Sequence, residues 1–94
     1  MKPKIDVQKI GDEEFQVVVA EGTTKSSHRV TLKADDYNRL SAGKVEPHEL
    51  IRKSFEFLLE HESKESILTS FDLMEIGRYF PSFEREIKQR LSRP

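Results

Sequence analysis

Residues 28–40 read HRVTLKADDYNRL, and the pattern of this stretch decides the fold class. As far as Lys33, apolar and polar residues alternate, which is typical of a strand with one buried face. Beyond Lys33, the apolar residues Tyr37 and Leu40 follow a helical spacing, which is typical of a helix that packs by one side. The change of period predicts an α+β domain whose first third is sheet and whose remainder is helical.

Two further strands are predicted before this stretch. Residues 4–8 alternate between polar and apolar, and residues 15–20 form a valine-rich run. The polar, glycine-containing segments 11–13 and 21–26 are expected to be turns, because glycine adopts the positive φ that hairpin loops need. Together with residues 28–33, these segments predict a three-stranded antiparallel β-meander with one apolar face.

The rest of the chain is expected to cover that face with about four helices. We place them at residues 34–42, from Pro47 to near His61, at about 73–79 and at 83–91, with a single turn at 65–69. The helix from Pro47 has apolar residues over nearly half its circumference, so we expect it to be central, with the sheet on one side and later helices on the other. The prediction is one α+β domain over residues 1–94.

A helix start is signalled most sharply at Asp72. Asp72 and Glu75 are spaced as in a capping box, and Phe71 and Ile76 are spaced as in a hydrophobic staple. This helix must end before Pro81, since the residue that precedes a proline disfavours helical geometry. The motif argues for structure and not for chemistry.

The charge balance argues against a generic nucleic-acid binder. Sixteen basic and seventeen acidic side chains give a net charge of -1, whereas proteins that bind polyanions usually carry a basic excess. Cysteine is absent, which removes disulfides and thiolate metal sites and fits a reducing compartment. No apolar run is long enough to span a bilayer. We therefore expect a soluble cytoplasmic protein with no membrane partner.

Catalytic and metal-binding constellations are not evident in the sequence. His48 and His61 are too far apart along one predicted helix, about 20 Å, to share a metal ion, and His28 lies on a separate strand. No glycine-flanked nucleophilic serine or phosphate-binding glycine loop occurs. We predict a protein that is not an enzyme and has no metal or cofactor.

Four aromatic residues, Phe71, Tyr79, Phe80 and Phe83, crowd one short region. They either belong to the core or expose an apolar patch for a partner. The sequence does not separate these alternatives. The leading hypothesis is a non-catalytic protein-interaction module that acts on an unidentified protein partner or by self-association.

Residues 28–60 loosely resemble ribbon-helix-helix DNA-binding proteins, on the order HRVTLK, DYNRL, Gly43 and PHELIR. The resemblance implies a dimeric regulator or antitoxin whose paired strands enter the major groove, with Arg29, Thr31 and Lys33 toward the bases. The chain departs from that pattern because residues 15–21 are expected to pair with the strand at residues 28–33 within one chain, which would block pairing across a dimer. Separately, residues 71–84 are similar to short conserved bacterial proteins of unknown function.

Overall fold

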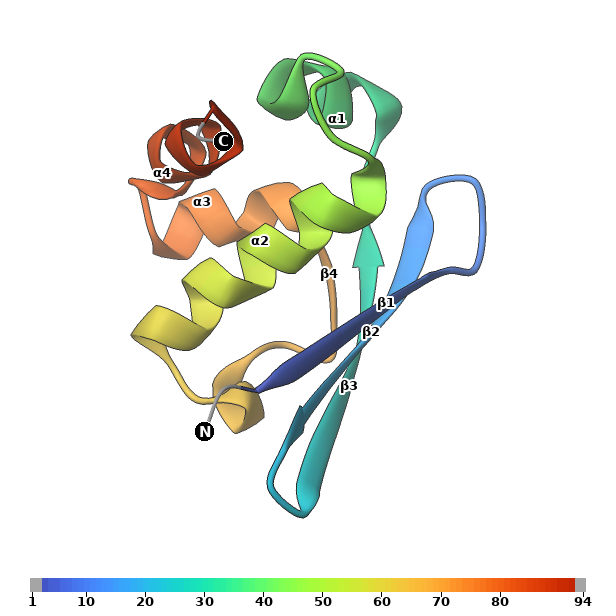
Figure 1. Cartoon of the computed structure of the whole chain (residues 1–94), viewed down its shortest axis with the longest axis vertical. Helices are drawn as coiled ribbons and strands as arrows, with labels where there is room; N and C mark the ends of the chain where they lie inside the picture. Colours follow the sequence, from blue (N-terminus) through green and yellow to red (C-terminus); the bar gives the residue numbers. More distant parts are fainter. Residues whose placement is uncertain (1–2, 93–94) are drawn as a thin grey trace.

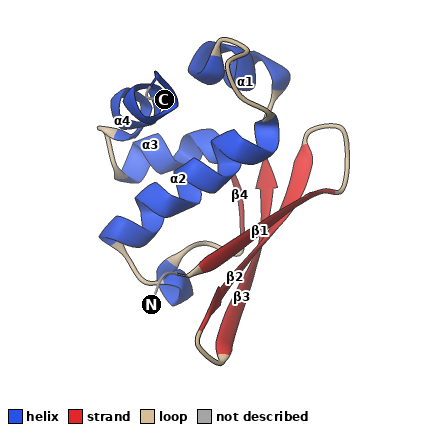
Figure 2. Cartoon of the chain, in the orientation of Figure 1, coloured by secondary structure: helices blue, strands red, loops and turns tan. Residues whose placement is uncertain are grey.

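A computed structural model of the chain describes residues 3–92, so the ends of the predicted domain, residues 1–2 and 93–94, lie outside the described part. The α+β class predicted from the sequence is confirmed (Figures 1 and 2). The elements in order are β1 (Lys4–Lys9), β2 (Glu14–Glu21), β3 (Thr24–Thr31), α1 (Ala34–Ser41), α2 (Pro47–His61), the 3₁₀ turn η1 (Lys64–Ser66), β4 (Ser70–Asp72), the 3₁₀ turn η2 (Leu73–Glu75), α3 (Ile76–Tyr79) and α4 (Phe83–Ser92).

The sheet has four strands in the order β1-β2-β3-β4, not the three that the sequence predicts. The first three strands form the expected antiparallel meander, whereas β4 runs parallel to β3, so the sheet is mixed. The prediction missed β4 because it is only three residues long and carries no alternating pattern of its own. Its pairing with β3 depends on contacts across the fold and not on local sequence.

The second hairpin is tighter than predicted. The expected loop at residues 21–26 is a turn of two residues, Gly22 and Thr23, and β3 already begins at Thr24. Gly22 has φ = 61°, as the first central residue of a type II′ hairpin turn requires. The polar start of β3 does not look like a strand on its own, but it pairs in register with the valine-rich end of β2.

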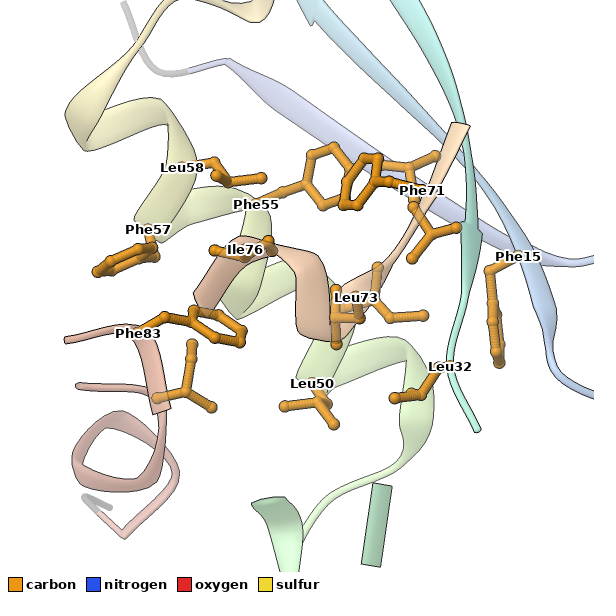
Figure 3. Packing of buried hydrophobic residues seen from close by; sticks show 14 of the residues in the cluster. Phe15, Leu32, Leu50, Phe55, Phe57, Leu58, Phe71, Leu73, Ile76 and Phe83 are labelled. Atoms are coloured by element: carbon orange, nitrogen blue, oxygen red, sulfur yellow. The ribbon is translucent and has the colours of Figure 1, made fainter. Parts of the chain in front are cut away.

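One face of the sheet forms the core, and α2 covers it as predicted. Phe55 of α2 is fully buried and packs against Phe71 of β4, with ring centroids 6.0 Å apart (Figure 3). On its other side α2 packs against α4, where Phe57 lies 5.5 Å from Phe83 between ring centroids. The helices lie on this side of the sheet only (Figure 1), which leaves side chains such as Gln16 on the opposite face exposed.

The segment after α2 returns to the sheet through the predicted capping box. The Asp72 carboxylate accepts a hydrogen bond from the Met74 N–H at 2.9 Å, and the Glu75 carboxylate accepts one from the Asp72 N–H at 2.9 Å. Phe71 and Ile76, the predicted staple, are both buried. Because the same Asp72 ends β4 and caps the following helical turn, strand and helix are fixed relative to each other.

Replacing Asp72 with alanine is expected to lower the free energy of unfolding by about 1 kcal/mol, the usual cost of losing an N-cap side chain. Asp72→Asn keeps an oxygen acceptor for the Met74 N–H, so we expect it to lower the free energy of unfolding clearly less than Asp72→Ala does. Urea denaturation followed by circular dichroism measures both variants. Equal losses for the two substitutions would show that the cap does not hold this segment.

Candidate functional site

The four aromatic candidates divide between the core and the surface. Phe83 is fully buried and Phe71 nearly so, whereas Tyr79 is 66% exposed and Phe80 is partly buried. Phe71, Tyr79 and Phe80 come together around one surface cavity, and Phe83 does not line it. Phe71 and Phe83 therefore belong to the core, whereas Tyr79 and part of Phe80 form exposed apolar surface.

This cavity, which we name the α3 hollow, lies between the segment that leads into β4 and helix α3. It has a volume of about 260 Å³. The α2 residue Leu58 and the staple residues Phe71 and Ile76 contribute its buried apolar lining. Leu68 on one side and Tyr79 on the other are its exposed apolar residues. The hollow is thus an opening into the edge of the core.

One wall of the hollow is the segment from Ser66 to Leu68, and β3 holds it in place. The Nδ1 atom of buried His28 lies 2.7 Å from the Leu68 carbonyl oxygen, and its Nε2 lies 2.8 Å from the Ser26 hydroxyl. Because a carbonyl can only accept, Nδ1 carries the proton and donates it to Leu68. His28 therefore fixes the backbone from which the exposed Leu68 side chain extends.

The opposite wall is α3 with Phe80, and the end of α2 supports it. The Phe80 ring stacks on the His61 ring, with centroids 5.0 Å apart and an angle of 28° between the planes. His61 in turn lies 4.6 Å from the Phe57 ring, and Phe57 is fully buried. This row of rings ties the mouth of the hollow to the core. Such aromatic contacts add about 0.5–1.5 kcal/mol each beyond area burial.

The charged residues that line the hollow are two carboxylates, Glu62 and Glu75. Glu75 is already engaged by the Asp72 N–H, while Glu62 forms no ion pair within residues 3–92. Two lining residues carry hydroxyl groups, Ser66 and Tyr79, and the Ser66 hydroxyl lies 3.3 Å from that of Ser63. This lining suits an apolar group that carries a cation beside it. Over the described residues, no cluster of three potential metal ligands occurs.

Next to the hollow, η1 is anchored by Lys64, whose side chain is only 4% exposed. Its ammonium donates to the Glu65 carboxylate at 2.5 Å and lies 3.7 Å from Glu21 of β2. The hydrogen bond with Glu65 raises the pKa of Lys64 above its ordinary value, and the same bond lowers the pKa of Glu65. The contact between Lys64 and Glu21 attaches the turn to the end of β2, whereas the bond with Glu65 stays within the turn.

The residues of the DNA-binding alternative lie on or next to the uncovered face of the sheet. Arg29 is exposed and Thr31 partly so, while Val30 between them is buried, as the alternation predicts. Lys33 is exposed at the start of α1, 3.8 Å from Asp72. However, β3 pairs with β2 on one edge and with β4 on the other within this chain. A ribbon shared between two chains would need one of those edges.

Several residues of the hollow are not among the sequence candidates. Leu58 and Ile76 are predicted to lie in the core, and both are buried there as well as lining the hollow. Glu62 and Leu68 lie in the connecting segments on either side of η1, and only Glu62 is not distinguished from its neighbours by the local pattern. For Leu68 the available signal is that it directly follows the apolar Ile67, because adjacent side chains of an extended segment point to opposite sides.

No protein-family model, curated protein or solved structure matches this chain. No helix within residues 3–92 has the length and apolar character needed to cross a bilayer. The geometry of the hollow and the chemistry of its lining therefore carry the functional argument.

The Lys64 contact predicts a specific dependence of stability on pH. Because the pKa of Glu65 is lowered in the folded chain, its ionised form stabilises the fold above its ordinary pKa of 4.5, and this stabilisation is lost as the pH falls through the folded value. Wild type is therefore expected to lose more unfolding free energy on acidification than Lys64→Met, as measured by urea denaturation at neutral and acidic pH.

Glu65→Gln serves as the matched control, since it removes the titrating group but keeps the side-chain length. Like Lys64→Met, it should lose less unfolding free energy on acidification than wild type does. Equal acid responses in wild type and both variants would contradict the assigned contact.

Proposed function

We propose that this chain is a cytoplasmic, non-catalytic protein-interaction module that binds its partner through the α3 hollow. One observation carries the proposal. Three large apolar side chains are exposed within the described residues, namely Ile10, Leu68 and Tyr79, and two of them line the same hollow. Exposed apolar surface that is gathered around a concave opening is typical of an interaction site, whereas isolated apolar residues are ordinary.

The size of the hollow favours a protein side chain over a small-molecule ligand. Its volume of about 260 Å³ lies below the roughly 300–1,000 Å³ that is usual for small-molecule and cofactor sites. A single leucine, methionine or phenylalanine side chain from a partner would be buried among Leu58, Ile76 and Phe80. Anchors of this kind, in a pocket surrounded by less important contacts, supply most of the energy in protein interfaces.

The charge of the rim favours a basic residue beside that anchor. The two carboxylates of the lining, Glu62 and Glu75, have no lysine or arginine among the residues that share the hollow with them. A lysine or arginine on the partner would complement Glu62 in particular, since its carboxylate is not engaged in an ion pair within residues 3–92. The proposed partner segment therefore pairs one large apolar residue with a neighbouring cation.

Selection of peptides from a random display library on the purified chain tests this proposal. The selected peptides are expected to share one large apolar residue next to lysine or arginine. Leu68→Asp should raise their Kd about tenfold or more, because it places a charge on the wall of the hollow and removes an apolar contact. Titration calorimetry with a synthesised peptide measures the change.

Ile10→Asp is the matched control, because Ile10 is 45% exposed and Leu68 is 47% exposed. Ile10 lies in the first hairpin, away from the hollow, so this variant should keep the wild-type Kd. The proposal fails if the selected peptides share no apolar anchor, or if Ile10→Asp weakens binding as much as Leu68→Asp does.

A further inference from the structure

Where β4 pairs with residues 29–31 of β3, this edge of the sheet is closed to further strands. The Arg29 N–H donates to the Thr69 carbonyl at 2.8 Å, which places the odd-numbered residues of β4 toward β3 and the even-numbered ones outward. Of the outward N–H groups, that of Asp72 is bound by the Glu75 carboxylate at 2.9 Å. β4 is also only three residues long. Short length and a blocked donor are the usual protections of a sheet edge.

The opposite edge, at β1, is open over six residues. The Ile10 N–H donates to the Glu14 carbonyl at 2.9 Å, so the even-numbered residues of this register face β2. The N–H and C=O groups of Ile5, Val7 and Lys9 therefore point away from the sheet. None of them has a hydrogen-bond partner within residues 3–92.

A groove of about 580 Å³ lies at the amino-terminal end of this open edge, between Pro3 and Ile5 on one side and the carboxyl-terminal half of α2 on the other. We name it the β1 groove. Ile5 and Leu59 contribute apolar surface to it. The charged lining consists of four carboxylates, those of Glu21, Glu56, Glu60 and Glu62, and one ammonium group, that of the buried Lys64. Glu60 is paired with Arg90 at 2.7 Å and Glu21 with Lys64 at 3.7 Å. Glu56 and Glu62 have no ion-pair partner in the described part of the chain.

The geometry points to β1 as a second docking site, where an extended segment of another protein with lysine or arginine at alternate positions adds as a fifth strand. The open groups of Ile5, Val7 and Lys9 would supply the ladder bonds that give strand addition its affinity. Side chains on one face of the added strand would enter the β1 groove, since side chains alternate along a strand. Their aliphatic stems would lie on Ile5 and Leu59, and their cationic ends would reach the carboxylates.

A second copy of the chain fits this edge less well. Two copies joined through β1 in one continuous sheet would have their helices on the same side, so each would bring its own acidic groove toward the other. Like charges brought together in this way oppose association. The β1 groove is separate from the α3 hollow, because Glu62 is the only described residue that lines both cavities.

The experiment uses the full chain labelled with ¹⁵N and a peptide as long as β1 that alternates valine and lysine, with blocked ends. Peptide titration should shift the amide signals of Ile5, Val7 and Lys9, and the affinity should fall as salt is added, because exposed charge pairs are screened. A peptide that alternates valine and glutamate has the same strand propensity and should leave these signals unchanged.

Val7→Pro tests the backbone contacts. It removes an outward N–H that the monomer does not use, and the ladder to β2 runs through the neighbouring residues. The variant is expected to raise the peptide Kd about tenfold or more, whereas Val7→Ala, which loses side-chain packing but keeps the N–H, should bind like wild type.

Glu56→Lys tests the charge contacts without altering the backbone, and so remains decisive if Val7→Pro does not fold. It should raise the Kd about fivefold, the upper range for an exposed charge pair, while Asp12→Lys in the first hairpin should leave the Kd unchanged. Leu68→Asp should also leave this Kd unchanged, which separates this site from the α3 hollow.

Three outcomes would overturn the inference. The first is binding of the valine–lysine peptide without shifts at β1. The second is that the valine–glutamate peptide binds as tightly as the valine–lysine peptide, or that Val7→Pro and Val7→Ala bind the valine–lysine peptide with the same Kd. The third is a dimer in sedimentation equilibrium without peptide that Val7→Pro dissociates, because it would assign this edge to a second copy.

Discussion

The attachment of the segment after α2 to the edge of β3 is the constraint on which the rest of this structure depends. The sheet has one apolar face, and α2 covers it. Phe55 of α2 packs against Phe71 of β4, whereas Phe57 packs against Phe83 of α4. The chain must then return across the end of α2 to bring Phe71 into the same core. Two contacts fix that return, from His28 to the Leu68 carbonyl and from the Arg29 N–H to the Thr69 carbonyl. Without them Phe71 and the helical turn that follows it would lose their position.

The proposed binding surfaces both follow from how short the returning segment is. β4 and α3 are three and four residues long, and elements of this length cannot close over the end of the core. The space left between them is the α3 hollow. On the other side of α2, β1 is an edge strand that pairs only with β2 among the described residues, so its outer edge keeps its unbonded backbone groups. Glu62, at the end of α2, lines both cavities and stands between them.

The parts of the fold that local pattern determines were predicted from the sequence, and the parts that depend on distant pairing were not. The capping box at Asp72 and Glu75 depends on residues three positions apart, so the sequence alone indicates it. The central position of α2 followed from the breadth of its apolar surface. β4 could not be predicted, because its bonds go to β3, some forty residues earlier in the chain. Leu68 was missed because its exposure is set by the neighbour Ile67, which occupies the core.

Hydrogen exchange of two amides in β3 tests most directly whether the returning segment is fixed to the sheet. Arg29 and Ser27 have N–H groups that point to the same edge, but only that of Arg29 is covered, by the Thr69 carbonyl. We expect the Arg29 amide to exchange as slowly as the amides bonded between β2 and β3, and the Ser27 amide to exchange much faster. Equally fast exchange of both amides would show that β4 is not held against β3. The α3 hollow would then have no fixed wall.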